Sequence, residues 1–73
     1  METKFSRHIL LYTDEEGYWI AEVPSLPGCH SFGETRDEAL TNVQEAIEVY
    51  IEALEQDGLP VPDEYHNVEL VQV

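Results

Sequence analysis

The sequence has very few basic residues. Its 73 residues include only three, Lys4, Arg7 and Arg36, against 16 aspartates and glutamates, which gives a formal net charge of −13. Proteins that hold nucleic acid through its phosphates need clustered lysine and arginine, and anionic membrane surfaces attract basic segments for the same reason. The composition therefore argues against direct nucleic-acid binding and against a membrane role. It favours a basic protein as partner, with solubility alone as the alternative explanation.

Cysteine and long apolar runs are also scarce. Cys29 is the sole cysteine, so no disulfide can form within the chain. No stretch approaches the roughly 20 apolar residues that span a bilayer, and the first residues lack the apolar run of a signal peptide. We therefore expect a cytoplasmic protein, and the length predicts a single domain over residues 1–73.

The histidines do not form a ligand pattern. His8, His30 and His66 are far apart in the sequence and match no metal spacing. Cys29 and His30 are neighbours on a predicted strand, where successive side chains point to opposite faces. We therefore expect no metal, no cofactor and no catalytic Cys/His pair.

One amphipathic helix dominates the sequence. Thr35 is a typical N-cap residue, and Glu38 three residues later completes a capping box, in which the Glu38 side chain returns to the backbone N–H of the cap. Gly58 and the prolines after it end the pattern, which predicts a helix over about 36–57. Between these signals, apolar residues recur at helical spacing: Leu40, Val43, Ile47, Tyr50, Ile51 and Leu54.

The segments around this helix have the composition of β-strands. Residues 5–13, 18–23, 29–34 and 68–73 are rich in aromatic and aliphatic side chains, and Asp14–Gly17 is a predicted turn. Three antiparallel strands, a crossover helix and a strand parallel to the first predict an α+β domain of order β-β-β-α-β. The expected sheet order is 3-2-1-4, with the helix on one face.

The predicted strands carry apolar residues on both faces. A sheet with one face in water alternates between apolar and polar residues, and a single helix covers only one face. We therefore expect a second copy of the chain, or another protein, to cover the other face. The candidate oligomer interface consists of Leu10, Tyr12, Tyr18 and Ile20.

Two groups of acidic residues are candidates for contact with a basic partner. One is the predicted turn, with Asp14, Glu15 and Glu16, and the other is a stripe on the helix, with Glu45, Glu48 and Glu52. The alternative interpretation is that these residues form a solvated turn and a solvated helix face.

A metal-dependent nuclease is the main enzyme hypothesis. The predicted order is the first half of a ribonuclease H-type fold, whose nucleases place carboxylates on the first strand, the helix and the fourth strand around metal ions. Here the middle of the first strand, residues 8–11, has no acid, and the last strand carries only Glu69. The pattern therefore does not favour catalysis.

Three motifs follow one another in the middle of the chain. They are W-x-A at residues 19–21, P-x-L-P-G-C-x-S-x-G-x-T at residues 24–35, and E-A-L-x-N-x-x-E-A-I at residues 38–47. In this order and spacing they resemble the N-terminal domain of the HicB-like antitoxin family, and the resemblance extends from Phe5 to Val73.

The resemblance implies a partial ribonuclease H-like fold and a non-catalytic protein. Such a protein binds and silences a small basic toxin of the HicA type, which cleaves mRNA, and it assembles as a homodimer or tetramer. Full-length family members also carry a C-terminal domain that binds operator DNA, and the sequence to Val73 has no such segment, so we expect no DNA-binding domain. The alternatives are a stand-alone homo-oligomeric regulator or scaffold without a toxin partner, and a residual nuclease.

Overall fold

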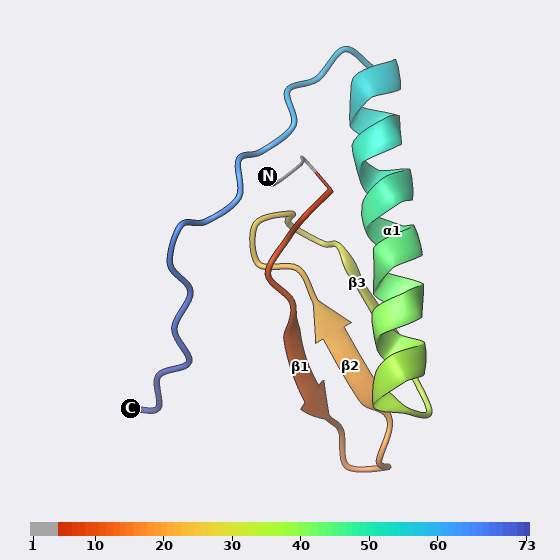
Figure 1. Cartoon of the computed structure of the whole chain (residues 1–73), viewed down its shortest axis with the longest axis vertical. Coiled ribbons are helices and arrows are strands. Elements are labelled where there is room, and N and C mark those ends of the chain that lie inside the picture. Colours follow the sequence, from red (N-terminus) through yellow and green to blue (C-terminus); the bar gives the residue numbers. More distant parts are fainter. Residues whose placement is uncertain (1–4) are drawn as a thin grey trace.

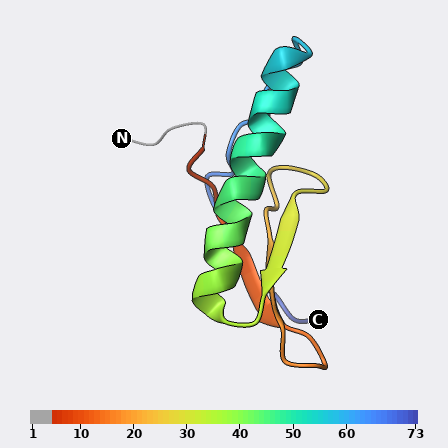
Figure 2. The ribbon, with the colours of Figure 1, turned by 90° about the vertical axis from the view of Figure 1, so that its right-hand side faces the viewer.

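A three-stranded antiparallel sheet and one long helix make up the regular structure of residues 5–73, the part that the computed structural model describes. The strands are β1 (Leu10–Thr13), β2 (Trp19–Glu22) and β3 (His30–Gly33), and the helix is α1 (Arg36–Gln56). β2 lies between β1 and β3, and α1 lies along one face of the sheet (Figures 1 and 2). The predicted α+β class and the β-β-β-α order are confirmed. Residues 1–4 of the predicted domain lie outside the described residues.

The turn between β1 and β2 is built by Asp14. Its carboxylate oxygen accepts hydrogen bonds of 2.9 Å from the backbone N–H groups of Glu16 and Tyr18. Gly17 has a φ of 90°, a left-handed conformation that glycine adopts without steric cost. The predicted turn at 14–17 is therefore confirmed, and it fixes the register that pairs Thr13 with Trp19.

The ends of α1 follow the sequence signals closely. Thr35 accepts a hydrogen bond of 3.1 Å from the backbone N–H of Glu38, as predicted for an N-cap. The Glu38 carboxylate accepts from the backbone N–H of Glu34 at 3.2 Å, one residue earlier than the capping-box prediction. At the other end, Gly58 adopts a φ of 70° and ends the helix.

The core lies between α1 and the sheet face that it covers. Gly33 lets β3 approach the start of the helix, because a Cβ at this position would lie 2.6 Å from the backbone nitrogen of Ala39. The buried apolar residues come from β2, the loop after it and one face of the helix: Ala21, Val23, Leu26, Cys29, Ala39, Val43, Ile47 and Ile51.

The chain after α1 does not form the predicted fourth strand. Residues 59–73 are extended and pass along the β1 side of the molecule (Figure 1), but among the described residues β1 pairs only with β2. The sheet therefore ends at β1, and the predicted order 3-2-1-4 is not found within this chain. The physical reason is that residues 65–73 are exposed throughout, so no packing against the core holds this segment beside β1.

Candidate partner-binding surfaces

The sheet face opposite α1 presents a cluster of apolar side chains. Ala21 is fully buried under the helix, so its strand neighbour Ile20 points to the other face. The register pairs Ile20 with Tyr12 on one side and with Phe32 on the other. The ring of Tyr18 packs edge-on against Phe32, with centroids 6.2 Å apart. We call this cluster the open face: Leu10, Tyr12, Tyr18, Ile20 and Phe32.

The structure therefore brings the predicted interface residues of β1 and β2 to one surface. It adds Phe32, which the sequence interpretation missed and which is 60% exposed. The available sequence signal was strand alternation, which places Phe32 on the face opposite Ser31 and Gly33, in agreement with their greater burial. Assigning Phe32 to the open face required the pairing of β3 with β2, which is a long-range property.

An acidic group borders the open face. The hydroxyl of Tyr12 donates a hydrogen bond of 2.9 Å to the carboxylate of Glu22. This hydrogen bond, together with partial desolvation and the negative charge of Glu22, raises the pKa of Tyr12 above its usual value. The phenol therefore stays neutral at physiological pH and acts as a hydrogen-bond donor at the rim.

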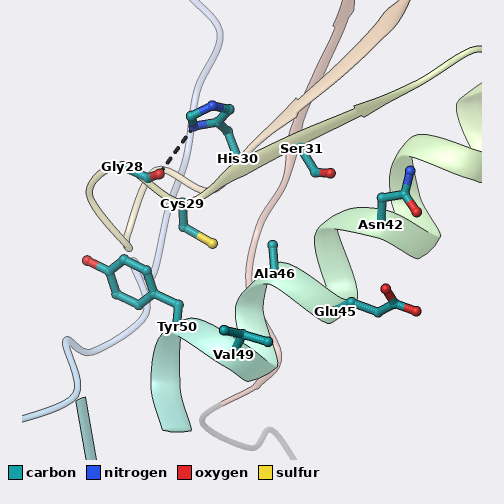
Figure 3. A pocket seen from close by; sticks show the side chains of 9 residues that line it. All are labelled: Gly28, Cys29, His30, Ser31, Asn42, Glu45, Ala46, Val49 and Tyr50. Carbon is teal, nitrogen blue, oxygen red and sulfur yellow. Dashed lines mark hydrogen bonds between the residues drawn. The ribbon is translucent and has the colours of Figure 1, made fainter. Parts of the chain in front are cut away.

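A groove runs between β3 and α1 on the other side of the molecule (Figure 3). Its floor is apolar, with Cys29 and Ala46, and the side chain of Val49 beside them is 66% exposed. Glu45 lies at its edge on the helix. An apolar floor with a carboxylate at the rim suits a protein side chain that is apolar along its length and positively charged at its tip.

The groove does not hold a nucleophile and base in contact. The sulfur of Cys29 points toward α1, whereas the ring of His30 lies on the other side of the strand, with Nδ1 3.2 Å from the backbone oxygen of Gly28 (Figure 3). Burial raises the pKa of the Cys29 thiol, which disfavours the reactive thiolate. Within residues 5–73, no three His, Cys, Asp or Glu side chains are placed to share a metal ion.

The predicted acidic contact residues do not form one patch. The turn at 14–16 lies at the end of the molecule where α1 begins (Figure 1). Glu45 borders the β3 groove, whereas Glu48 borders a second groove beside the N-terminal segment. All of these residues are exposed, including Glu52, and Asp14 also holds the turn together.

A polar cluster joins the start of the C-terminal segment to the residues before β1 and to the loop after β2. Glu64 accepts a hydrogen bond from the backbone N–H of His8, and the buried Ser25 accepts one of 3.2 Å from Arg7. Burial raises the pKa of Glu64, but hydrogen bonds from Tyr65, His8 and Ser25 and the charge of His8 outweigh it, so the net pKa is lowered. The carboxylate is therefore held in its charged form.

No helix among residues 5–73 combines the length and the apolar character needed to cross a bilayer.

Sequence comparison relates most of the chain to one family. A family described as "HicB_like antitoxin of bacterial toxin-antitoxin system" matches residues 8–72. A UPF0150 protein of Archaeoglobus fulgidus is 42% identical over 67 residues, which cover 89% of this chain and 90% of that protein. A UPF0150 protein of Thermoplasma acidophilum is 44% identical over 54 residues, or 74% of this chain and 78% of that protein.

Structural comparison gives the same relationship. The crystal structure of the N-terminal domain of the Burkholderia pseudomallei antitoxin HicB matches with a TM-score of 0.64 and 35% sequence identity. The match covers 86% of this chain and 66% of that chain, so the present chain spans just under two thirds of the solved one. The arrangement of three strands and one helix is therefore shared with a protein named as an antitoxin.

Proposed function

Because this chain belongs to the HicB_like antitoxins of bacterial toxin–antitoxin systems, we propose that it is a non-catalytic antitoxin that binds and neutralises a small basic toxin of the HicA type in the cytoplasm. The observation that carries the proposal is the net charge of −13 on a domain similar to the N-terminal domain of an antitoxin. Opposite charges accelerate the encounter of two proteins and suppress association with wrong partners.

The contact site proposed on the helix is the β3 groove together with the exposed acids of α1. Hot spots in protein interfaces combine an apolar anchor with surrounding groups that exclude water. The groove offers an apolar floor beside Val49, and Glu45 supplies a negative charge at its edge. Glu48 and Glu52 extend the acidic surface along the helix, and the turn at 14–16 is a second proposed contact.

Growth rescue is the direct test of this function. The toxin candidate is the product of an adjacent gene that encodes a short basic protein. Its expression alone should stop growth, and co-expression of the present chain should restore it. The purified proteins should also form a complex in 50 mM NaCl that weakens steadily toward 500 mM, because salt screens attraction between exposed charges. If co-expression leaves growth arrested and no complex forms at low salt, the proposal is wrong.

A matched pair of variants locates the contact. Neutralising Glu45, Glu48 and Glu52 together as glutamines should raise the Kd for the toxin at least tenfold. The control removes the same number of charges at exposed acids that line neither the groove nor the turn at 14–16, as Asp37→Asn, Asp57→Asn and Asp63→Asn. Equal effects of the two triple variants would show that only net charge matters and would contradict a contact on the helix.

Self-association is proposed as part of the same function. The open face supports it, because contiguous exposed apolar side chains mark interaction surfaces and a domain of this size gains stability from assembly. The alternative function, a stand-alone homo-oligomeric regulator, rests on the same surface. A stable oligomer that neither binds nor neutralises the neighbouring basic protein would favour this alternative.

A further inference from the structure

The two edges of the sheet are not equivalent. At the outer edge of β3, the side-chain amide of Asn42 on α1 donates a hydrogen bond of 2.8 Å to the backbone oxygen of Phe32. This contact occupies a carbonyl that a further strand would need. The edge of β3 is therefore partly occupied by the chain's own helix.

The outer edge of β1 is open. The backbone N–H of Asp14 donates to the oxygen of Tyr18 at 2.9 Å, which makes these two residues a hydrogen-bonded pair of the hairpin. Such pairs alternate along an antiparallel ladder, so Leu11 and Thr13 direct their N–H and C=O groups away from β2. Among residues 5–73 no strand meets them. An open edge is a template for pairing with another chain.

The C-terminal tail, residues 65–73, has no assigned secondary structure and no pairing partner among the described residues. It is extended and exposed throughout, with Leu70 89% and Val71 68% accessible. Residues 68–73 read Val-Glu-Leu-Val-Gln-Val, a composition that favours strands and contains no glycine or proline. This is an aggregation hazard in a free monomer, which indicates that the tail has a defined place in an assembly.

The chain's own β1 does not take up this tail. Val61 packs against the core, and the Glu64 carboxylate contacts His8 just before β1 begins. The tail that follows these residues therefore lies on the β1 side of the molecule (Figure 1). It nevertheless passes β1 without forming a ladder. The tail and the edge of β1 thus both lack a pairing partner in one copy, and the edge adjoins the open face, since Leu10 and Tyr12 belong to β1.

We propose that residues 68–73 pair as a fourth strand with the open edge of β1 in a second copy of the chain, and that two copies exchange their tails reciprocally. The inference rests on the self-association proposed above and assigns its geometry. A symmetric exchange satisfies both edges and both tails with one type of contact. The charge distribution also favours this exchange, because β1 has no charged residue and the segment 68–73 has only Glu69. The contact therefore brings few negative charges of the two like-charged copies together.

Proline variants of the full-length chain test the ladder. Proline lacks the N–H that a ladder needs, and in a strand alternate N–H groups face the partner, so Leu70→Pro and Val71→Pro are tested separately. At least one should raise the dimer Kd tenfold or more in sedimentation experiments, while the helical signal in circular dichroism stays unchanged. The control Val71→Thr keeps the backbone N–H and the β-branched side chain. Its dimer Kd should stay within threefold of that of the unaltered chain. A dimer that neither proline variant weakens would overturn the proposal.

Isotope-filtered NMR distinguishes exchange between chains from pairing within one chain. In a mixture of differently labelled copies, backbone contacts between β1 and residues 68–73 should connect unlike labels. Contacts found only within one label, or no contact between these segments, would overturn the exchange. Toxin binding is measured on the same variants, so a proline variant that dissociates yet still neutralises the toxin would support the exchange and leave the antitoxin role intact.

Discussion

The hydroxyl of Tyr50 donates a hydrogen bond of 2.8 Å to the backbone oxygen of Pro27 and so joins the helix to the loop between β2 and β3. Tyr50→Phe removes the donor and keeps the ring. We expect the free energy of unfolding to fall by about 1 kcal/mol, measured as a lower urea midpoint with an unchanged slope. Tyr65→Phe, at a tail residue that is 51% exposed, is the control and should change the midpoint little. Equal midpoints for both variants would remove the structural role given to Tyr50.

Gly33 should tolerate no side chain. A Cβ at this position would meet the backbone nitrogen of Ala39 at 2.6 Å, so Gly33→Ala must push β3 and the start of α1 apart. Overpacking of this kind costs roughly 1–3 kcal/mol, and we expect a clear drop in the thermal midpoint. Ser31→Ala, in the same strand, is the matched control. An unchanged midpoint for Gly33→Ala would mean that the contact between strand and helix is looser than described.

Glu64 should make stability depend on pH. Burial raises its pKa, but the hydrogen bonds and the charge of His8 lower it below the usual 4.5. A carboxylate with a lower pKa in the folded chain contributes stability above its unfolded pKa and loses it as the pH falls through the folded value. Glu64→Gln should therefore be less stable than the unaltered chain at pH 7, and the difference should shrink progressively below pH 4.5.

The control for this pH effect is Asp63→Asn, because Asp63 is the exposed neighbour of Glu64. Urea unfolding at several pH values gives the free energy of unfolding as a function of pH. The curve for this control should run parallel to that of the unaltered chain. A constant difference between Glu64→Gln and the unaltered chain from pH 7 to pH 3 would contradict the assignment.

The open face should govern self-association without governing the fold. Phe32 is 60% exposed, so Phe32→Ser should change the free energy of unfolding of the monomer little while it weakens the dimer about tenfold or more, as expected for an aromatic anchor. Val49→Ser, at a residue on the helix that is 66% exposed, should leave the dimer intact. Sedimentation velocity over a concentration series gives the dimer affinity of each variant, and urea unfolding gives the stability. Similar dimer affinities for Phe32→Ser and Val49→Ser would contradict the interface.

Salt should move the two proposed interactions in opposite directions. Each copy carries a formal charge of −13, so two copies repel one another, whereas a basic toxin is attracted. Raising NaCl from about 50 to 500 mM shortens the screening length severalfold, which should strengthen the dimer and weaken the toxin complex. Titration calorimetry and sedimentation in matched buffers check this, and a dimer that also weakens with salt would indicate an ionic interface instead.

The sequence predicted the elements that depend on local signals. Thr35 and Gly58 mark the helix ends through backbone capping, and Gly17 marks the hairpin through its left-handed conformation. These signals act within a few residues and need no knowledge of distant parts. The β-β-β-α part of the fold follows from them together with short connections.

The failures concern contacts between distant residues. The tail at 68–73 has the composition of a strand, but composition does not say whether a strand finds its partner in the same chain. Phe32 was missed because its side of the sheet depends on pairing with Ile20. The spacing of Glu45 and Glu48 places them on one stripe of the helix, but it does not tell that they border different grooves, because β3 lies on one side of α1 and the N-terminal segment on the other.

The contact between Asn42 and Phe32 also sets a limit on growth. A sheet with two free margins can recruit neighbours at both and lengthen into a fibre, whereas here the side chain of Asn42 occupies a backbone oxygen at the β3 margin. In the reciprocal exchange proposed above, the other margin is taken by the tail of the second copy, so a closed pair leaves no β1 edge on which a further strand can add.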